Sequence, residues 1–133
     1  MKKALKIVIE ASSDFFDGYV ENLEGIYGAG NTIEACKADI ISSLEEMRHT
    51  QPTNLPQWVI DGDYVIEYHF DTRSLMAYFS GIVSQKAIAE RAGINPKQLQ
   101  HYASGISKPR EQQHHRIVTA YRELGQEMMS VTV

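Results

Sequence analysis

Polar and basic side chains with hydrogen-bonding capacity are concentrated between residues 85 and 110. Lys97 and His101 lie four residues apart, so both point to one side of a helix. Lysine donates to guanine in the major groove of DNA, glutamine pairs with adenine through two hydrogen bonds, and histidine donates or accepts. The predicted chemistry is therefore recognition of bases and phosphates, although each residue singly also fits a solvated helix face. The candidate DNA contacts are Gln85, Lys86, Asn95, Lys97, Gln98, Gln100, His101, Ser104, Lys108 and Arg110.

The spacing of smaller and apolar residues predicts a helix-turn-helix that positions these candidates. Such a motif needs a small residue where the first helix crosses the second, and Ala89 supplies it. Four residues later Gly93 tolerates a left-handed turn, and Ile94 fills the core beneath it. Leu99 and Tyr102 then anchor the second helix from its inner side. The alternative is a helical hairpin with a structural role alone.

In this arrangement the second helix presents its outward face to the major groove. Lys97 and His101 lie on that face, with the other polar residues of the helix beside them. Gln85 and Lys86 stand at the amino end of the preceding helix, where phosphates would pass. Lys108 and Arg110 can neutralise further backbone charge.

Helical periodicity extends through the whole second half, from residue 71 to residue 133. Asp71 is suited to cap a first helix containing Leu75, Met76 and Phe79, and a second helix is expected from Ser84 to Ala92. A third helix is expected after Asn95-Pro96, because proline is favoured at the first helical position. A fourth helix follows Pro109 and carries an apolar stripe at Ile117, Tyr121, Leu124 and Met128.

The first half, residues 1–70, predicts a small sheet with one helix, in the order β-β-β-α-β. Leu5, Ile7 and Ile9 alternate with polar positions, as in a strand with one buried face. Residues 12–18 are expected to form a turn in which Gly18 is available for a positive φ, followed by strands at residues 19–22 and 24–30. Asn31 is predicted to cap a helix that ends near His49, with an apolar stripe at Ile33, Cys36, Ile40, Leu44 and Met47. A surface connection at residues 51–57 and a strand at residues 64–70 complete this domain. The predicted fold class is therefore α+β, with an all-α second domain.

Charge divides the chain in the same way. The net charge is −4, but residues 1–80 hold six Lys and Arg against thirteen Asp and Glu, whereas residues 81–133 hold seven against four. The resulting net charges, −7 for residues 1–80 and +3 for residues 81–133, indicate two domains with different partners. A polyanion would be drawn to the second half. Two ordinary surfaces that happen to differ would show the same asymmetry.

Other functional classes find little support. The single cysteine, Cys36, excludes an internal disulfide framework and suits a reducing cytoplasm, where we expect the protein. Cys36 is expected to be buried and inert, and no apolar run reaches the roughly 18 residues of a membrane span. His114 and His115 are adjacent and cannot share a helix face, so no metal site is predicted. Glu10, Asp14 and Asp17 form no evident two-metal cluster, so we expect no catalytic residues and no cofactor.

Two stretches of the sequence resemble known families. Residues 84–109, including Gly105-x-Ser107-Lys108-Pro109, are similar to the helix-turn-helix of the Cro/repressor-like (XRE) class. The chain as a whole resembles the HicB family of type II antitoxins. The matching residues are the opening strand, Asp17-Gly18-Tyr19, Leu23-x-Gly25 and Gly28-x-Gly30-Asn31-Thr32-x-Glu34-Ala35. Where that family often has a Pro-Asp-Leu-Pro-Gly-Cys segment, this chain has residues 21–26 of different character.

The resemblance implies a partial RNase H-like first domain that binds and blocks HicA, a small basic RNA-cleaving toxin, and a second domain that represses its own operon. An acidic first half would attract a basic toxin, although the same charge also serves solubility. We expect operator DNA as a partner and a homodimer or a dimer of dimers. The competing hypothesis is a transcription regulator whose first domain binds a small ligand or only dimerises. A nuclease would require the carboxylate cluster that the sequence lacks.

Overall fold

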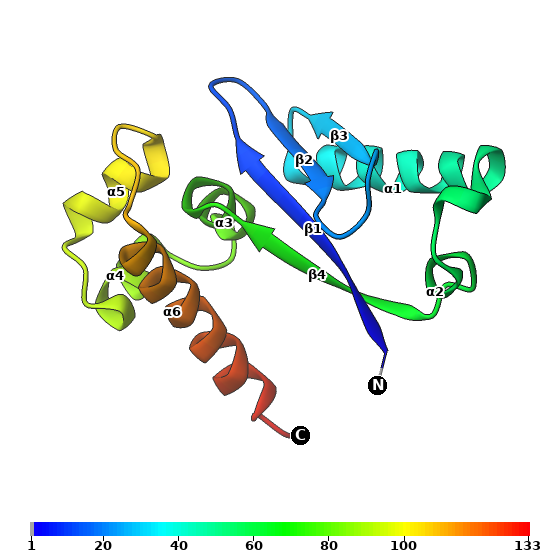
Figure 1. Ribbon diagram of the computed structural model, residues 1–133. Coiled ribbons are helices and arrows are strands. Elements are labelled where there is room, and N and C mark those ends of the chain that lie inside the picture. Colours follow the sequence, from blue (N-terminus) through cyan, green and yellow to red (C-terminus); the bar gives the residue numbers. More distant parts are fainter. Residues whose placement is uncertain (1) are drawn as a thin grey trace. The chain divides into compact units, whose positions relative to one another are not determined.

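The computed structural model describes residues 2–133 and is of the α+β class, as predicted. The chain divides into two compact units, one reaching to Phe70 and one from Asp71 to Val133. This division falls where the hydrophobic period of the sequence changes from two to 3.6 residues. Each unit is described by itself, and their elements are labelled in Figure 1. No helix within residues 2–133 combines the length and the apolar character needed to cross a membrane.

The first unit is built on a four-stranded sheet in the order β3-β2-β1-β4. Its strands are β1 (Lys3–Ala11), β2 (Phe16–Val20), β3 (Tyr27–Gly30) and β4 (Tyr64–Phe70). β1 pairs antiparallel with β2 and parallel with β4, so the chain must cross over between β3 and β4. Leu5, Ile7 and Ile9 of β1 are completely buried. The predicted β-β-β-α-β order and the buried alternation of β1 are confirmed.

The crossover is made by α1 (Ile33–Thr50), which lies along one face of the sheet (Figure 1). Its apolar stripe is buried as predicted, at Ile33, Cys36, Ile40 and Leu44. The prediction of Asn31 as its cap is wrong by one residue. Thr32 has the extended backbone of a cap, and its hydroxyl accepts a hydrogen bond of 3.1 Å from the Ala35 amide.

Glycines allow α1 to approach the sheet closely. A Cβ on Gly28 would lie 2.6 Å from the Ile40 nitrogen, and one on Gly30 would lie 2.6 Å from the Cys36 nitrogen. Gly18 has the same role, because its Cβ would lie 2.9 Å from Cδ1 of Ile40 in α1 and 2.5 Å from the Val8 carbonyl oxygen of β1. The prediction that Gly18 is a turn residue with positive φ is therefore wrong: it lies within β2, and its backbone is not left-handed. Close packing, and not a turn, requires glycine there.

Side chains close the β3 edge of the sheet. Asp39 of α1 accepts a hydrogen bond of 2.8 Å from the Ala29 amide, and the Ser43 hydroxyl donates to the Tyr27 carbonyl at 2.8 Å. At the opposite edge, β4 is less covered: Tyr68 is 36% exposed, and the Lys37 ammonium lies 4.1 Å from its ring centroid. The sheet therefore has one edge capped by the helix and one flanked by exposed apolar side chains.

The connection from α1 to β4 is more structured than predicted. It contains a 3-10 turn, η1 (Pro52–Asn54), and a short helix, α2 (Gln57–Ile60). Leu55 and Val59 are buried, at 7% and 0% exposure. The prediction of a plain surface connection is corrected accordingly, because these two apolar residues fold the segment against the rest of the unit.

The second unit consists of four helices, as predicted: α3 (Thr72–Phe79), α4 (Gln85–Ala92), α5 (Pro96–Ser104) and α6 (Glu111–Met129). The predicted apolar stripe of α6 is only partly buried: Ile117 is completely buried, but Met128 is 61% exposed. α3 and α4, which pack on α6, have eight residues each, whereas α6 has nineteen. They are too short to cover the carboxyl-terminal turns of α6.

We predict that Gly28→Ala destabilises the first unit by about 1–3 kcal/mol, because the new methyl group must displace the α1 backbone. Trp58, the single tryptophan of the sequence, lies in this unit, so its fluorescence during urea unfolding reports the change. Gly125→Ala is the control, since a Cβ there meets no atom within 4 Å. Equal midpoints for Gly28→Ala and the unmodified protein would contradict the close-packing role.

Candidate nucleic-acid interface

A left-handed turn joins α4 to α5. Gly93 has φ 67° and ψ 36° and ends α4, its amide donating to the Ala89 carbonyl. The Ile94 amide donates to the same carbonyl at 3.0 Å, so both residues after α4 return their hydrogen bonds to the helix. Ala89 and Ile94 are buried, at 2% and 7% exposure. The predicted left-handed turn at Gly93 and the predicted burial of Ile94 are confirmed.

α5 is fixed from its inner side. Leu99 and Tyr102 are buried, at 0% and 7% exposure, where α5 packs against α3 and α4. Pro96 occupies the first turn, and the Asn95 Oδ1 accepts a hydrogen bond of 2.9 Å from the Lys97 amide. A capped helix that buries one face must expose the opposite one.

The exposed face of α5 carries four of the predicted contacts. Lys97, His101 and Ser104 follow each other at intervals of four and three residues and therefore form one row. Gln100 lies next to these three residues. Lys97, Gln100 and Ser104 are exposed, whereas His101 is half-buried. The Ser104 hydroxyl donates to the His101 carbonyl at 3.3 Å, which leaves its oxygen able to accept another bond. We call Lys97, Gln100, His101 and Ser104 the α5 row.

Two other predicted contacts are engaged elsewhere. Gln98 lies one turn before the buried Tyr102 and is half-buried, and its Nε2 donates to the Ser107 hydroxyl at 3.3 Å. The helical rotation of 100° per residue thus turns Gln98 away from the α5 row. The Asn95 side chain is used as the helix cap, which also provides a structural reason for its presence.

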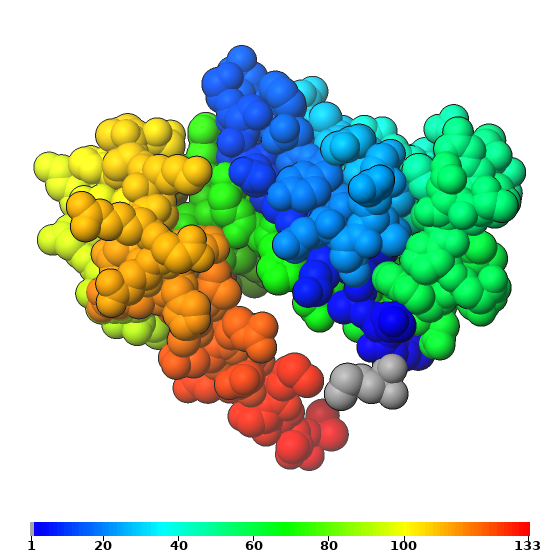
Figure 2. All heavy atoms as spheres, in the orientation of Figure 1, coloured from blue at the N-terminus to red at the C-terminus, as the bar shows by residue number. Residues whose placement is uncertain are grey.

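The remaining four candidates lie on both sides of α5 in the sequence and are all exposed. Gln85 and Lys86 occupy the first turn of α4, which Ser84 caps through a hydrogen bond of 3.1 Å to the Ala87 amide. Lys108 and Arg110 lie in the connection to α6. The yellow to orange atoms of α5 and this connection are at the surface of the second unit (Figure 2).

Two arginines that the sequence did not single out support the ends of α4 and α5. Arg116 of α6 donates from Nη2 to the Gly93 carbonyl at 3.2 Å. Arg73 of α3 lies over Gly105, the left-handed residue that ends α5, where a Cβ would be 2.8 Å from its Nη1. Both contacts join residues 23 or more positions apart, so no local pattern indicates them.

A polar contact also ties α6 to α3. The Thr72 hydroxyl and the His114 Nδ1 are 2.6 Å apart and hydrogen-bonded, and Thr72 is buried. Burial lowers the pKa of His114 below its ordinary value of 6.5, against the smaller opposing influence of Glu111 and Asp71. Either partner can donate in this contact, the Thr72 hydroxyl to an unprotonated Nδ1 or a protonated Nδ1 to the Thr72 oxygen, so burial and not the hydrogen bond lowers the pKa of His114.

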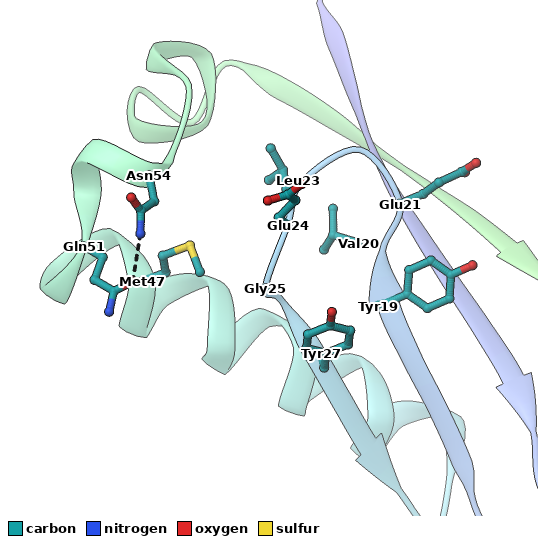
Figure 3. Close-up of a pocket in the computed structure, with 10 residues that line it drawn as sticks. All are labelled: Tyr19, Val20, Glu21, Leu23, Glu24, Gly25, Tyr27, Met47, Gln51 and Asn54. Atoms are coloured by element: carbon teal, nitrogen blue, oxygen red, sulfur yellow. Dashed lines mark hydrogen bonds between the residues drawn. The ribbon is translucent and has the colours of Figure 1, made fainter.

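A groove in the first unit is a second candidate surface. It has a volume of about 870 Å³ and lies between the β2–β3 loop, the end of α1 and η1 (Figure 3). Tyrosine, glutamate, apolar and amide side chains line it, together with Gly25: Tyr19, Val20, Glu21, Leu23, Glu24, Tyr27, Met47, Gln51 and Asn54. No pattern in the sequence indicates this groove, because its walls come from three separate segments.

We predict that Gly93→Ala destabilises the second unit by about 1–2 kcal/mol, because an L-residue is strained at φ 67° and its Cβ would lie 2.9 Å from the Arg116 guanidinium. Urea unfolding followed by helical circular dichroism measures the loss. Gly81→Ala is the matched control, since Gly81 has no positive φ and a Cβ there meets nothing within 4 Å. A cost no larger than that of the control would rule out the turn as the constraint.

We predict that His114 makes the protein less stable as the pH falls. Because the folded state lowers this pKa, the unfolded chain binds the proton more tightly. The contribution of His114 is complete above pH 6.5 and is lost as the pH falls through the lowered folded value. His114→Asn keeps an acceptor for Thr72 but does not titrate, so its free energy of unfolding should fall less between pH 8 and pH 5. Parallel pH profiles for the two proteins would contradict this assignment.

Comparisons of the chain with family models, with curated proteins and with solved structures found no match. The geometry of the α5 row, the turn at Gly93 and the division of charge between the units are therefore the grounds for a functional proposal.

Proposed function

We propose that this protein is an antitoxin of the HicAB type that binds operator DNA through its second unit and a small basic RNA-cleaving toxin through its first. The observation that carries the proposal is the position of α5: a capped helix, held on its inner face by Leu99 and Tyr102, on which Lys97 is exposed and His101 is half-buried. In this proposal α4, Gly93 and α5 form a helix-turn-helix, and α5 is the recognition helix.

The composition of the α5 row supports DNA as the ligand. Lysine, glutamine, histidine and serine all offer donors or acceptors to base edges in the major groove. Lys86, Lys108 and Arg110 are exposed on neighbouring segments and would contact phosphates. Residues 71–133 carry eight Lys and Arg against five Asp and Glu, a charge of +3 that favours a polyanion.

The first unit has the opposite charge. Up to residue 70 it carries five Lys and Arg against twelve Asp and Glu, or −7. Such a surface steers a basic protein toward it. The resemblance to the HicB family, which rests in part on Gly28-x-Gly30, supplies the toxin class and a partial RNase H-like fold. These two glycines pack against α1, which gives the motif a structural reason.

We further propose that the protein is a homodimer or a dimer of dimers, because helix-turn-helix proteins read paired half-sites. The uncovered end of α6 and the residues after it supply apolar surface for such an interface. Met128, Met129 and Val131 are 61%, 87% and 77% exposed.

A second candidate is a transcription regulator whose first unit binds a small ligand and has no toxin partner. The groove of the first unit favours it, because about 870 Å³ lies in the range of small-molecule sites. The two candidates share the DNA-binding role and differ in what occupies the first unit.

We predict that Lys97→Ala and His101→Ala each relax sequence preference by about 1–3 kcal/mol. A site is first selected from random duplex DNA with the unmodified protein, and affinities for that site and a scrambled one are then measured at several salt concentrations. Lys108→Ala should weaken both affinities equally. It should also reduce the slope of the logarithm of affinity against the logarithm of salt concentration by about one, because one phosphate contact is lost. Arg122→Ala, on α6, is the control for the loss of one exposed cation. If the Lys97/His101 double variant keeps full preference, α5 is not the recognition helix.

The toxin is tested separately. A short reading frame beside the gene, encoding a basic protein with one candidate catalytic histidine, is expected from the first candidate and not from the second. Its product should co-purify with the full chain and lose RNA-cleaving activity in the complex. A neighbouring product that cleaves RNA equally well in the presence of the chain would exclude the antitoxin role and leave the regulator.

A further inference from the structure

The groove of the first unit has the chemistry of a cation receptor. Two of its lining residues are glutamates, Glu21 and Glu24, and none of the ten is lysine, arginine or histidine. Both glutamates are exposed, and neither takes part in an ion pair within the part of the chain that the structure describes. Their charges are therefore available to a cationic ligand.

Two tyrosines give the groove an aromatic wall. Tyr19 of β2 and Tyr27 of β3 are directly opposed in the register of the two strands, on the sheet face that α1 does not cover. Their exposed fractions are 38% and 66%, which is high for aromatic residues of a sheet. In Figure 3 the two rings project from neighbouring strands, and the Tyr27 ring lies near Gly25. A guanidinium or ammonium group is attracted to the face of such a ring.

The remaining wall suits a long aliphatic stem that ends in hydrogen-bond donors. Leu23 and Met47 are half-buried and offer apolar surface. The Asn54 amide nitrogen donates to the Gln51 Oε1 at 2.9 Å, so the Asn54 carbonyl oxygen is left to accept. Arginine combines an apolar stem, a planar group that stacks on aromatic rings and five donors for carboxylates and carbonyls.

We propose that this groove is where the first unit binds its protein partner, by receiving arginine side chains of a basic polypeptide. The inference deepens the toxin-binding part of the proposed function and rests on it. A polypeptide is the expected occupant because the groove extends from the β2–β3 loop to the end of α1 and η1, farther than one side chain fills. The occupant is expected to be positively charged, because the groove carries two carboxylates and the first unit has a net charge of −7.

The test is a titration of the full-length, isotope-labelled protein with the peptide acetyl-Gly-Arg-Gly-Arg-Gly-amide, followed by amide chemical shifts. The matched probe replaces both arginines with citrulline, which has the same shape and no charge. We expect shifts at residues 19–27 and 47–54, and only with the arginine peptide. Glu21→Gln/Glu24→Gln should weaken binding about fivefold, and Tyr27→Ala about threefold. Trp58 fluorescence and the dispersion of the amide spectrum show that each variant is folded.

The control is Asp61→Asn/Asp63→Asn, which removes the same charge from an exposed turn outside the groove and should weaken binding about twofold or less. Equal losses in the two double variants would overturn the proposal, because net charge alone would then explain binding. Shifts centred elsewhere, or equal binding of the citrulline peptide, would overturn it too. Free arginine that binds as tightly as the peptide would replace the polypeptide with a small ligand. If the toxin co-purifies with the chain but the peptide does not bind in the groove, the toxin binds another surface. If both experiments fail, the antitoxin role itself is excluded.

Discussion

The second unit depends on one backbone constraint, the left-handed conformation of Gly93. In this conformation the chain leaves α4 and begins α5 three residues later, while the amides of Gly93 and Ile94 both donate hydrogen bonds to the Ala89 carbonyl. The resulting direction of α5 buries Leu99 and Tyr102 and leaves the α5 row exposed, except for the half-buried His101. Arg116 of α6 donates a hydrogen bond to the Gly93 carbonyl, so the longest helix of the unit contacts the turn between α4 and α5. A proposed DNA-reading surface of four side chains thus follows from one residue without a Cβ.

The first unit uses glycine for a different purpose. Gly18, Gly28 and Gly30 remove side chains from the face that meets α1, so the helix backbone approaches the strands directly. Large side chains of β2 and β3 then project from the opposite face, where Tyr19 and Tyr27 are exposed. The packing that closes the core on one side therefore supplies an aromatic wall on the other, beside the carboxylates of the groove. Core and proposed recognition surface are two consequences of the same alternation of a strand.

Much of the fold could be predicted because its signals are local. Three helices are capped by a side chain that accepts a hydrogen bond from a backbone amide two or three residues along the chain, and the capping residues are Asp71, Ser84 and Asn95. These residue types at these positions predict helix starts from the sequence alone. The period of two in β1, and the period of 3.6 beyond residue 71, likewise reflect contacts that each element makes with one neighbouring layer. The residues of the α5 row could be named for the same reason, since four residues make one turn of helix.

The tertiary structure alone decided what depends on distant residues. The serines and aspartates of residues 12–18 predict a turn at Gly18, whereas its role is set by the Val8 carbonyl and the Ile40 side chain. The helical spacing predicts Gln98 as a DNA contact beside Lys97 and His101, but its side chain is half-buried and donates to the Ser107 hydroxyl. The exposure of the end of α6 follows from the lengths of α3 and α4, and the groove from three segments that meet only in the folded unit. Such contacts leave no periodic trace in the sequence, because periodicity records the face that a residue occupies and not the partner it meets there.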